Sequence, residues 1–169
     1  MADTVGRTSS LSDLYVRQLP SAIGLAFLLI GDRSLAEDIA QEAFVRLTGR
    51  FGHIRSPEGF DAYLRKTVVN LCLSNLRHRR VERSFTERAL GQAPPLPPEM
   101  PDVTLQEELW EALRQLPHRQ RAAVVLRYFE DLSERQSAEI LRCSVPALRS
   151  LVARAMDSLR QLIRGDQDG

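Results

Sequence analysis

The side chains with the clearest chemical character lie on one face of a helix that the sequence predicts over residues 34 to 48. Ser34 and Glu37, three residues apart, form a capping-box pattern at its start. An apolar stripe at helical spacing would face a core: Ala36, Ile39, Ala40, Ala43, Phe44 and Leu47. The other face carries Glu37, Asp38, Gln41 and Glu42. A face so rich in carboxylates either stays in water or binds a basic partner.

A second polar face has the opposite charge and lies on a helix predicted over residues 57 to 82. Its apolar positions should be buried: Phe60, Tyr63, Leu64, Thr67, Val68, Leu71, Cys72 and Leu76. The remaining side carries Lys66, Asn70, Ser74 and Arg77 and leads into Arg79, Arg80 and Arg83. Cations and short hydrogen-bonding groups in a stripe suit a phosphate backbone, although a solvated basic face has the same composition.

The segment before that helix, residues 50 to 56, is predicted to be a loop with a chemistry of its own. It contains Arg50, Phe51, His53 and Arg55. An unstacked nucleotide needs a surface to stack on and donors for its exposed edge, and this loop offers both.

The C-terminal part shows a fixed order of short helix, three-residue turn and longer helix. Ser133 and Gln136 form a capping-box pattern for a helix over residues 134 to 141, and Pro146 fits the first turn of a helix over residues 145 to 163. This spacing is typical of a helix-turn-helix, with a plain helical hairpin as the alternative. Arg149, Ser150 and Arg154 would be exposed near the start of the second helix, where a major groove can be read.

The elements that position these faces are all helical. Further helices are predicted over residues 11 to 30, with Pro20 as a candidate interruption, and over 105 to 116 and 117 to 130. No segment alternates with period two. Residues 89 to 104 hold five of the nine prolines and predict a linker. The fold class is therefore all-α, with two small helical domains, 11 to 88 and 105 to 164, whose relative placement is loosely set. Residues 1 to 10 and 165 to 169 are expected to be disordered.

Composition excludes several classes of protein. The chain has 169 residues, a net charge of +1 and 43% hydrophobic residues, which is ordinary for a folded chain. Cys72 and Cys143 show no metal-binding spacing, and no nucleophile with its base or phosphate-cradling loop is found, so neither a cofactor, a metal nor an enzyme activity is expected. The apolar run over residues 22 to 30 is too short to cross a bilayer, so we expect a cytoplasmic protein without membrane insertion.

Three stretches together resemble the extracytoplasmic-function sigma factors of the bacterial sigma-70 family. GDRSLAEDIAQEAFVRL is similar to the region 2.2 helix, and FDAYLRKTVVNLCLSNLRHRR to regions 2.3 and 2.4. The stretch from LRQLPHRQRAAVVLRYFEDL through SERQSAEILRCSVPALRSLVARAMDSLRQL is similar to region 4. The resemblance covers about residues 11 to 163 and implies a specificity subunit of RNA polymerase, with core polymerase and promoter DNA as partners. The family often uses an anti-sigma protein, whose existence here the sequence leaves open.

The resemblance also implies roles for particular residues. Positions that dock on core polymerase correspond to Asp32, Glu37, Asp38, Gln41, Glu42 and Phe44. Positions at the unpaired minus-ten strand correspond to Arg50, Phe51, His53, Arg55, Lys66, Asn70, Ser74, Arg77, Arg79 and Arg80. Positions at the minus-thirty-five element correspond to Ser144, Ala147, Arg149, Ser150 and Arg154.

This chain departs from the family pattern at several of these places. A turn glycine is common where Arg142 stands, threonine where Ala147 stands, and arginine where Leu151 stands. Fewer polar contacts to the minus-thirty-five element follow, so we expect weaker dependence on it or a readout that depends on Arg149 and DNA shape. The alternative function is a stand-alone helix-turn-helix regulator, for which a symmetric dimer and a palindromic target would be expected.

Overall fold

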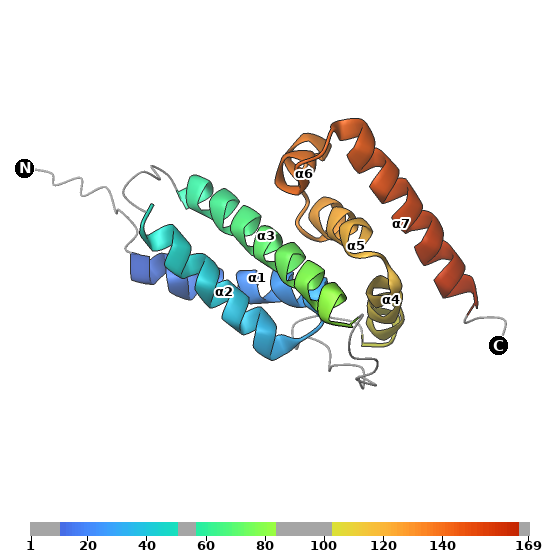
Figure 1. Cartoon of the computed structure of the whole chain (residues 1–169), viewed down its shortest axis with the longest axis horizontal. Helices are drawn as coiled ribbons and strands as arrows, with labels where there is room; N and C mark the ends of the chain where they lie inside the picture. Colours follow the sequence, from blue (N-terminus) through green and yellow to red (C-terminus); the bar gives the residue numbers. More distant parts are fainter. Residues whose placement is uncertain (1–10, 51–56, 84–102, 166–169) are drawn as a thin grey trace, which may run out of the picture.

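The computed structural model describes residues 11–50, 57–83 and 103–165, and in these ranges the chain forms helices joined by short turns. The expected all-α class is confirmed, with no strand in the described residues. Figure 1 shows the long helix α3 running diagonally between the N-terminal helices and a C-terminal group of helices. The proline-rich stretch lies outside the described residues up to position 102.

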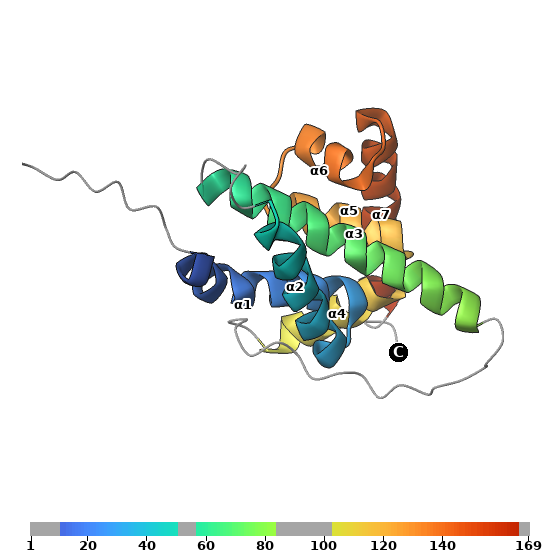
Figure 2. The same ribbon diagram turned by 60° about the vertical axis from the view of Figure 1, so that its left-hand side comes forward.

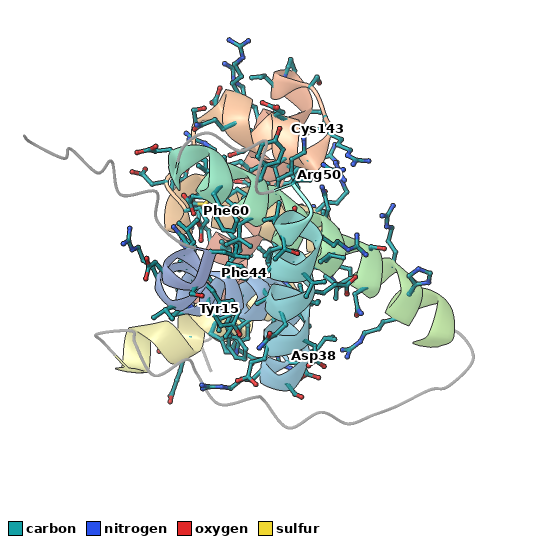
Figure 3. All side chains as sticks on the ribbon, turned by 90° about the vertical axis from the view of Figure 1, so that its left-hand side faces the viewer. Tyr15, Asp38, Phe44, Arg50, Phe60 and Cys143 are labelled. Carbon is teal, nitrogen blue, oxygen red and sulfur yellow. The ribbon has the colours of Figure 1, made fainter. Side chains whose placement is uncertain are left out.

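The N-terminal unit consists of three packed helices, α1 (Leu11–Ile30), α2 (Arg33–Thr48) and α3 (Pro57–Arg83). Its core contains an aromatic cluster with one ring from each helix. The ring of Phe44 lies 5.0 Å from that of Tyr15, edge-on, and 5.7 Å from that of Phe60. Figure 3 shows these three side chains between the helices. The apolar stripe predicted for α2 is buried at every position, which confirms it.

Helix α1 is continuous through Pro20, so the expected interruption does not occur. Its apolar face is held against α2 and α3 by Leu25, Ala26 and Leu29, and this packing offsets the hydrogen bond that proline cannot donate. Among the described helices, α1 has the length and mean hydropathy (1.3) of a membrane span, with 33% of that stretch buried. The expectation concerned residues 22 to 30 alone, whereas the whole of α1 meets these criteria by length and composition only.

The start of α2 differs from the expected capping box. The helix begins at Arg33, and Asp32 is its N-cap, accepting a hydrogen bond from the backbone N–H of Leu35 at 3.0 Å. A carboxylate at this point also interacts favourably with the helix dipole. Ser34 lies inside the first turn instead of capping it, because Gly31, at φ +78°, ends α1 one residue before Asp32.

The C-terminal unit begins with two helices and a π-helical turn: α4 (Val103–Gln115), α5 (His118–Val124) and η2 (Val125–Phe129). It continues with the helix-turn-helix pair α6 (Glu134–Leu141) and α7 (Val145–Gly165). The predicted capping box of α6 is confirmed: Gln136 N–H donates to Ser133 Oγ, and Ser133 N–H donates to Gln136 Oε1.

The turn of the helix-turn-helix contains a strained residue. Arg142 ends α6 in the left-handed conformation, with φ 53° and ψ 47°. This conformation costs a residue with a Cβ roughly 1–2 kcal/mol, which is why glycine favours it. Its backbone N–H is satisfied by Glu139 O and that of Cys143 by Ala138 O, so the turn itself is well formed.

The two units pack against each other, which corrects the expectation of a loose placement. The ring of Trp110 on α4 stacks on Phe27 of α1 with 5.0 Å between centroids. Arg121 on α5 donates to Leu29 O at 2.8 Å, and Arg65 on α3 pairs with Glu130 at 2.9 Å. A single hydrophobic core therefore extends through both units. The apolar end of α1 and the indole of Trp110 both leave water on contact, and this burial favours the closed arrangement.

Candidate partner-binding and nucleic-acid-binding surfaces

The acidic face of α2 is exposed as predicted. Glu37, Asp38, Gln41 and Glu42 all face solvent, and we call these four residues the acidic face. Two of its carboxylates pair along the helix, Glu37 with Arg33 at 3.3 Å and Glu42 with Arg46 at 2.6 Å. Asp38 takes part in none of the described ion pairs. Exposed pairs of this kind contribute at most about 1 kcal/mol, so the carboxylates remain available to a partner.

Phe44 has a different place from the one expected. Its side chain is 3% exposed and belongs to the aromatic core, so it supports the acidic face from behind and does not contact a partner directly. Val45 is 68% exposed instead. It stands four residues after Gln41 and seven after Asp38, on the same side of the helix. The acidic face therefore carries an exposed apolar group, which the sequence pattern had not singled out.

Figure 3 places Asp38 at the end of α2 farthest from Cys143, which lies in the turn between α6 and α7. A large partner on the acidic face would thus approach from the side opposite the helix-turn-helix. Asp32 lies at the same end of α2, half-buried as a cap, with Oδ2 3.7 Å from a guanidinium nitrogen of Arg79 on α3.

The polar face of α3 runs along the junction between the two units. Lys66, Asn70 and Ser74 are half-buried and Arg77 is exposed, and we call these four residues the α3 basic face. Tyr63 was expected in the core but is 49% exposed. It lies at the junction, where the hydroxyphenyl group lines a cavity shared with α6, so the helical spacing alone assigned it to the wrong side.

Part of the expected loop lies outside the described residues. Phe51, His53 and Arg55 belong to that part, and the side chain of Arg80 on α3 does too. Arg50, directly after α2, is exposed. In Figure 3 its side chain lies toward the same end of the molecule as Cys143.

The C-terminal unit covers part of the α3 basic face. A cavity of about 760 Å³ has Asn70 and Arg77 on one wall and Arg119, Leu141 and Arg142 on the other. A second cavity of about 340 Å³ places Lys66 opposite Gln136 and Ile140 of α6. Figure 2 shows α6 lying over the first half of α3. In this arrangement Lys66, Asn70 and Ser74 are half-buried beside the C-terminal unit, and Arg77 stays exposed.

The recognition helix α7 presents its polar residues outward. Ala147, Arg149, Ser150 and Arg154 are exposed, while Leu148, Ala155 and Leu159 are buried against the rest of the unit. Ser144 caps α7 and accepts a hydrogen bond from the backbone N–H of Ala147 at 3.2 Å. Arg149 pairs with Glu134 of α6 at 2.8 Å, which orients its guanidinium across the start of both helices. The helix-turn-helix surface is accessible even in the closed arrangement.

Three residues at the junction were missed because their partners are remote in sequence. Arg121 is 5% exposed and donates to the carbonyls of Leu29, Arg114 and Leu116. Burial, and secondarily the charge of Arg114, lower its pKa to about 10, so it stays charged at neutral pH. Trp110 and Arg65 complete the set. The one tryptophan of the chain, on the amphipathic helix α4, was the signal that could have indicated a docking contact.

These surfaces define a class of protein. The C-terminal unit carries a DNA-binding helix-turn-helix, and the N-terminal unit carries an acidic face on α2 and a basic face on α3. Two sigma-70 family models match the chain, region 2 over residues 14–82 and region 4 over residues 106–159. The RNA polymerase sigma-E factor of Streptomyces coelicolor is 34% identical over 160 residues, covering 91% of this chain and 87% of the relative. The sigma factor EcfG of Rhodopseudomonas palustris is 31% identical, with 94% and 88% covered.

The chain belongs to the extracytoplasmic-function group of RNA polymerase sigma factors in the sigma-70 family. Solved structures agree with the fold. The sigma factor RpoE of Bartonella quintana, in complex with the anti-sigma factor NepR, matches with a TM-score of 0.75 at 23% identity, covering 90% of this chain and 96% of that one. CnrH in complex with the cytosolic domain of CnrY matches with a TM-score of 0.66 at 20% identity, covering 95% and 92%. The protein is a transcription initiation factor.

Proposed function

We propose that the acidic face of α2 binds core RNA polymerase, that the α3 basic face and the loop before it hold the minus-ten strand, and that the start of α7 reads the minus-thirty-five element. The observation that carries this assignment is the separation of charges. The carboxylates lie at the end of α2 remote from the helix-turn-helix, and the cations lie along α3 and α7. Polymerase and DNA would then approach from different sides without competing.

The closed arrangement supplies a physical reason for poor DNA binding by the free chain. The proposed strand-binding side chains Asn70 and Lys66 face the C-terminal unit. The free energy of contact between the two units therefore opposes the opening that lets a DNA strand reach α3. Docking on polymerase would hold the units apart, and the second DNA contact then becomes intramolecular. The chain itself supplies binding surfaces, and we assign no catalytic step to it.

We place the protein in the cytoplasm, where core polymerase acts. The structural relative RpoE is described in complex with an anti-sigma factor, and a protein of this kind that stabilised the closed arrangement would keep this chain inactive. The closed contacts at Trp110 and Arg65 are the points at which such stabilisation would act.

A mobility-shift experiment tests whether stable promoter binding requires core polymerase as well as this chain. With a duplex promoter at 150 mM salt, the free chain is expected to form no stable complex, whereas addition of core polymerase gives a stable, sequence-specific one. The reason is that each unit alone contributes few phosphate contacts, each worth a salt slope of about 0.9 on duplex DNA. Tight, sequence-specific binding by the isolated chain would contradict the proposal and favour a stand-alone regulator.

Arg149 is expected to carry most of the base readout by α7. Arg149→Ala should weaken holoenzyme binding to a promoter with both elements by roughly 5- to 150-fold, the range for loss of one bidentate base contact. The loss should be confined to promoters with an intact minus-thirty-five element, measured by filter binding. Arg160→Ala, which removes an exposed arginine paired with Asp157 farther along α7, is the matched control. Equal losses for both variants would mean that Arg149 contributes charge without base readout.

A further inference from the structure

Two cavities adjoin along the junction between α3 and the C-terminal unit. One, of about 760 Å³, and another, of about 470 Å³, share Pro117 and His118 in their linings. Arginines from both units converge on them, and we call these six residues the junction arginines: Arg77, Arg79, Arg114, Arg119, Arg121 and Arg142. Neither cavity has a carboxylate among the described residues that line it. Positive charge is therefore concentrated at the junction between the two units in the closed arrangement.

Most of this charge has no partner of opposite sign in the described part of the chain. Arg79 and Arg114 have carboxylates near them, Asp32 at 3.7 Å and Glu111 at 3.2 Å. The other four junction arginines form none of the described ion pairs. The guanidinium of Arg119 donates a hydrogen bond to Leu141 O, and that of Arg121 donates to three backbone carbonyls. Arg77, Arg119 and Arg142 are exposed to water, whereas the buried Arg121 has only the partial charges of carbonyls around it.

Arg121 is the most deeply buried of the junction arginines. Its side chain is 95% buried, from a relative exposure of 5%, and its Nε is buried without a hydrogen-bond acceptor among the described residues. Buried donors without an acceptor are rare in folded proteins, and each one calls for an explanation. The same residue is among those that line the 470 Å³ cavity.

Arg142, at the other end of the joined cavities, occupies a backbone position that favours glycine. Its φ of 53° is strained for any side chain with a Cβ, yet an arginine stands there and lines the 760 Å³ cavity. Residues that break a local backbone rule beside a cavity are often retained for function.

We propose that the junction arginines form a binding site for a small polyphosphate anion of the nucleoside triphosphate class. Guanidinium groups bind phosphate oxygens in pairs, and several arginines match the several charges of a phosphate chain. Leu73, Leu141 and Pro117 supply an apolar wall of the larger cavity, suited to a base. The volumes fall in the ordinary range for small-molecule sites.

Because the walls come from both units, the ligand would link them and favour the closed arrangement. Binding itself does not depend on the promoter assignment. One consequence does rest on the proposed function: Asn70 and Arg77 line the same cavity, so an occupied site excludes the minus-ten strand from α3. A phosphorylated metabolite bound at this site would then stabilise the closed arrangement of the sigma factor and keep DNA from the α3 basic face.

Titration calorimetry of the full chain tests the site without promoter DNA. ATP, GTP and inorganic tripolyphosphate are titrated in turn at 150 mM salt, with orthophosphate as the low-charge comparison. We expect saturable one-to-one binding of the nucleotides, weaker binding of tripolyphosphate because it lacks the base, and none of orthophosphate. Equal affinity for tripolyphosphate and nucleotides would overturn the nucleoside part of the proposal, and no saturable binding would overturn the site.

Variants on the two walls separate the site from general charge effects. Arg142→Gly and Arg79→Gln should each weaken nucleotide binding at least tenfold, although they belong to different units. Arg142→Gly should also raise the melting temperature, since glycine relieves the strain at φ 53°, so the loss cannot come from unfolding. Arg164→Gln, at the exposed end of α7, is the control and should bind as the wild type does. Equal losses in all three variants, or saturable binding of DNA oligonucleotides only, would contradict the proposal.

Discussion

Replacing Asp38 and Glu42 together by lysine is expected to weaken binding to core RNA polymerase at least about 100-fold, because like charges facing each other across an interface cost several kcal/mol. Both side chains are exposed on α2, and neither supports the core. The new lysine at position 42 would repel Arg46 one turn away by only about 0.2–0.5 kcal/mol, so the helix should persist. Fluorescence anisotropy with labelled chain and purified core polymerase measures the affinity, and circular dichroism checks the fold.

Asp157→Lys is the matched control for this charge reversal. It also removes an exposed carboxylate that pairs with an arginine on the same helix, in this case Arg160 on α7. Its change in net charge per site is the same, so any general repulsion from polymerase would appear in it too. If the double variant kept wild-type affinity, or if Asp157→Lys lost as much per site, the acidic face would not be the polymerase-binding surface.

Replacing Trp110 by alanine is expected to raise the affinity of the free chain for single-stranded minus-ten DNA about tenfold or more. Trp110 stacks on Phe27 and lies over Gly31, so its removal weakens the contact between the units by a large part of the roughly 3–5 kcal/mol typical of such truncations. Apparent affinity rises with the fraction of open molecules, and each 1.4 kcal/mol is a factor of ten. Anisotropy with a labelled oligonucleotide measures binding, and small-angle scattering reports the opening.

Two further variants separate opening from simple destabilisation. Glu130→Arg replaces the ion pair with Arg65 by a like-charge contact, which should separate the two units without any change at Trp110. We expect a smaller gain in oligonucleotide affinity than for Trp110→Ala. Leu113→Ala removes a buried side chain from the core that lies within the C-terminal unit, and so should lower stability without increasing strand binding. An increase in the radius of gyration without a gain in affinity would show that α3 is not the strand-binding face.

Much of the fold was predictable because it depends on neighbours in the sequence. The buried stripe of α2, the capping box at Ser133 and the bounds of α6 all follow from spacings of three and four residues. Exposure of Glu37, Asp38 and Glu42, and of Arg149 and Arg154 on α7, followed from the same periodicity. The roles of these residues in binding polymerase and DNA stay predictions, which the variants above test.

The local pattern failed where a distant segment decides the environment. Tyr63 fits the apolar spacing of α3, yet α6 packs over that part of the helix and leaves the tyrosine at the junction. Pro20 reads as a helix breaker, but the packing of α1 on α2 and α3 keeps the helix intact. At the start of α2 the glycine turn at Gly31 selected Asp32 as the cap over Ser34.

The sequence by itself determined the helices, the sign of charge on each face and the sigma-factor family, because periodicity, capping and motif order are local properties of the chain. Only the tertiary structure decided that the two units close on each other through Trp110, Arg121 and the Arg65–Glu130 pair. These contacts join residues 65 to 92 positions apart, and no spacing rule reaches that far. The physical reason is that the free energy of contact between the units depends on which apolar surfaces meet and leave water, and this is known only once the whole chain is folded. That closure covers part of the α3 basic face and gathers the junction arginines around shared cavities.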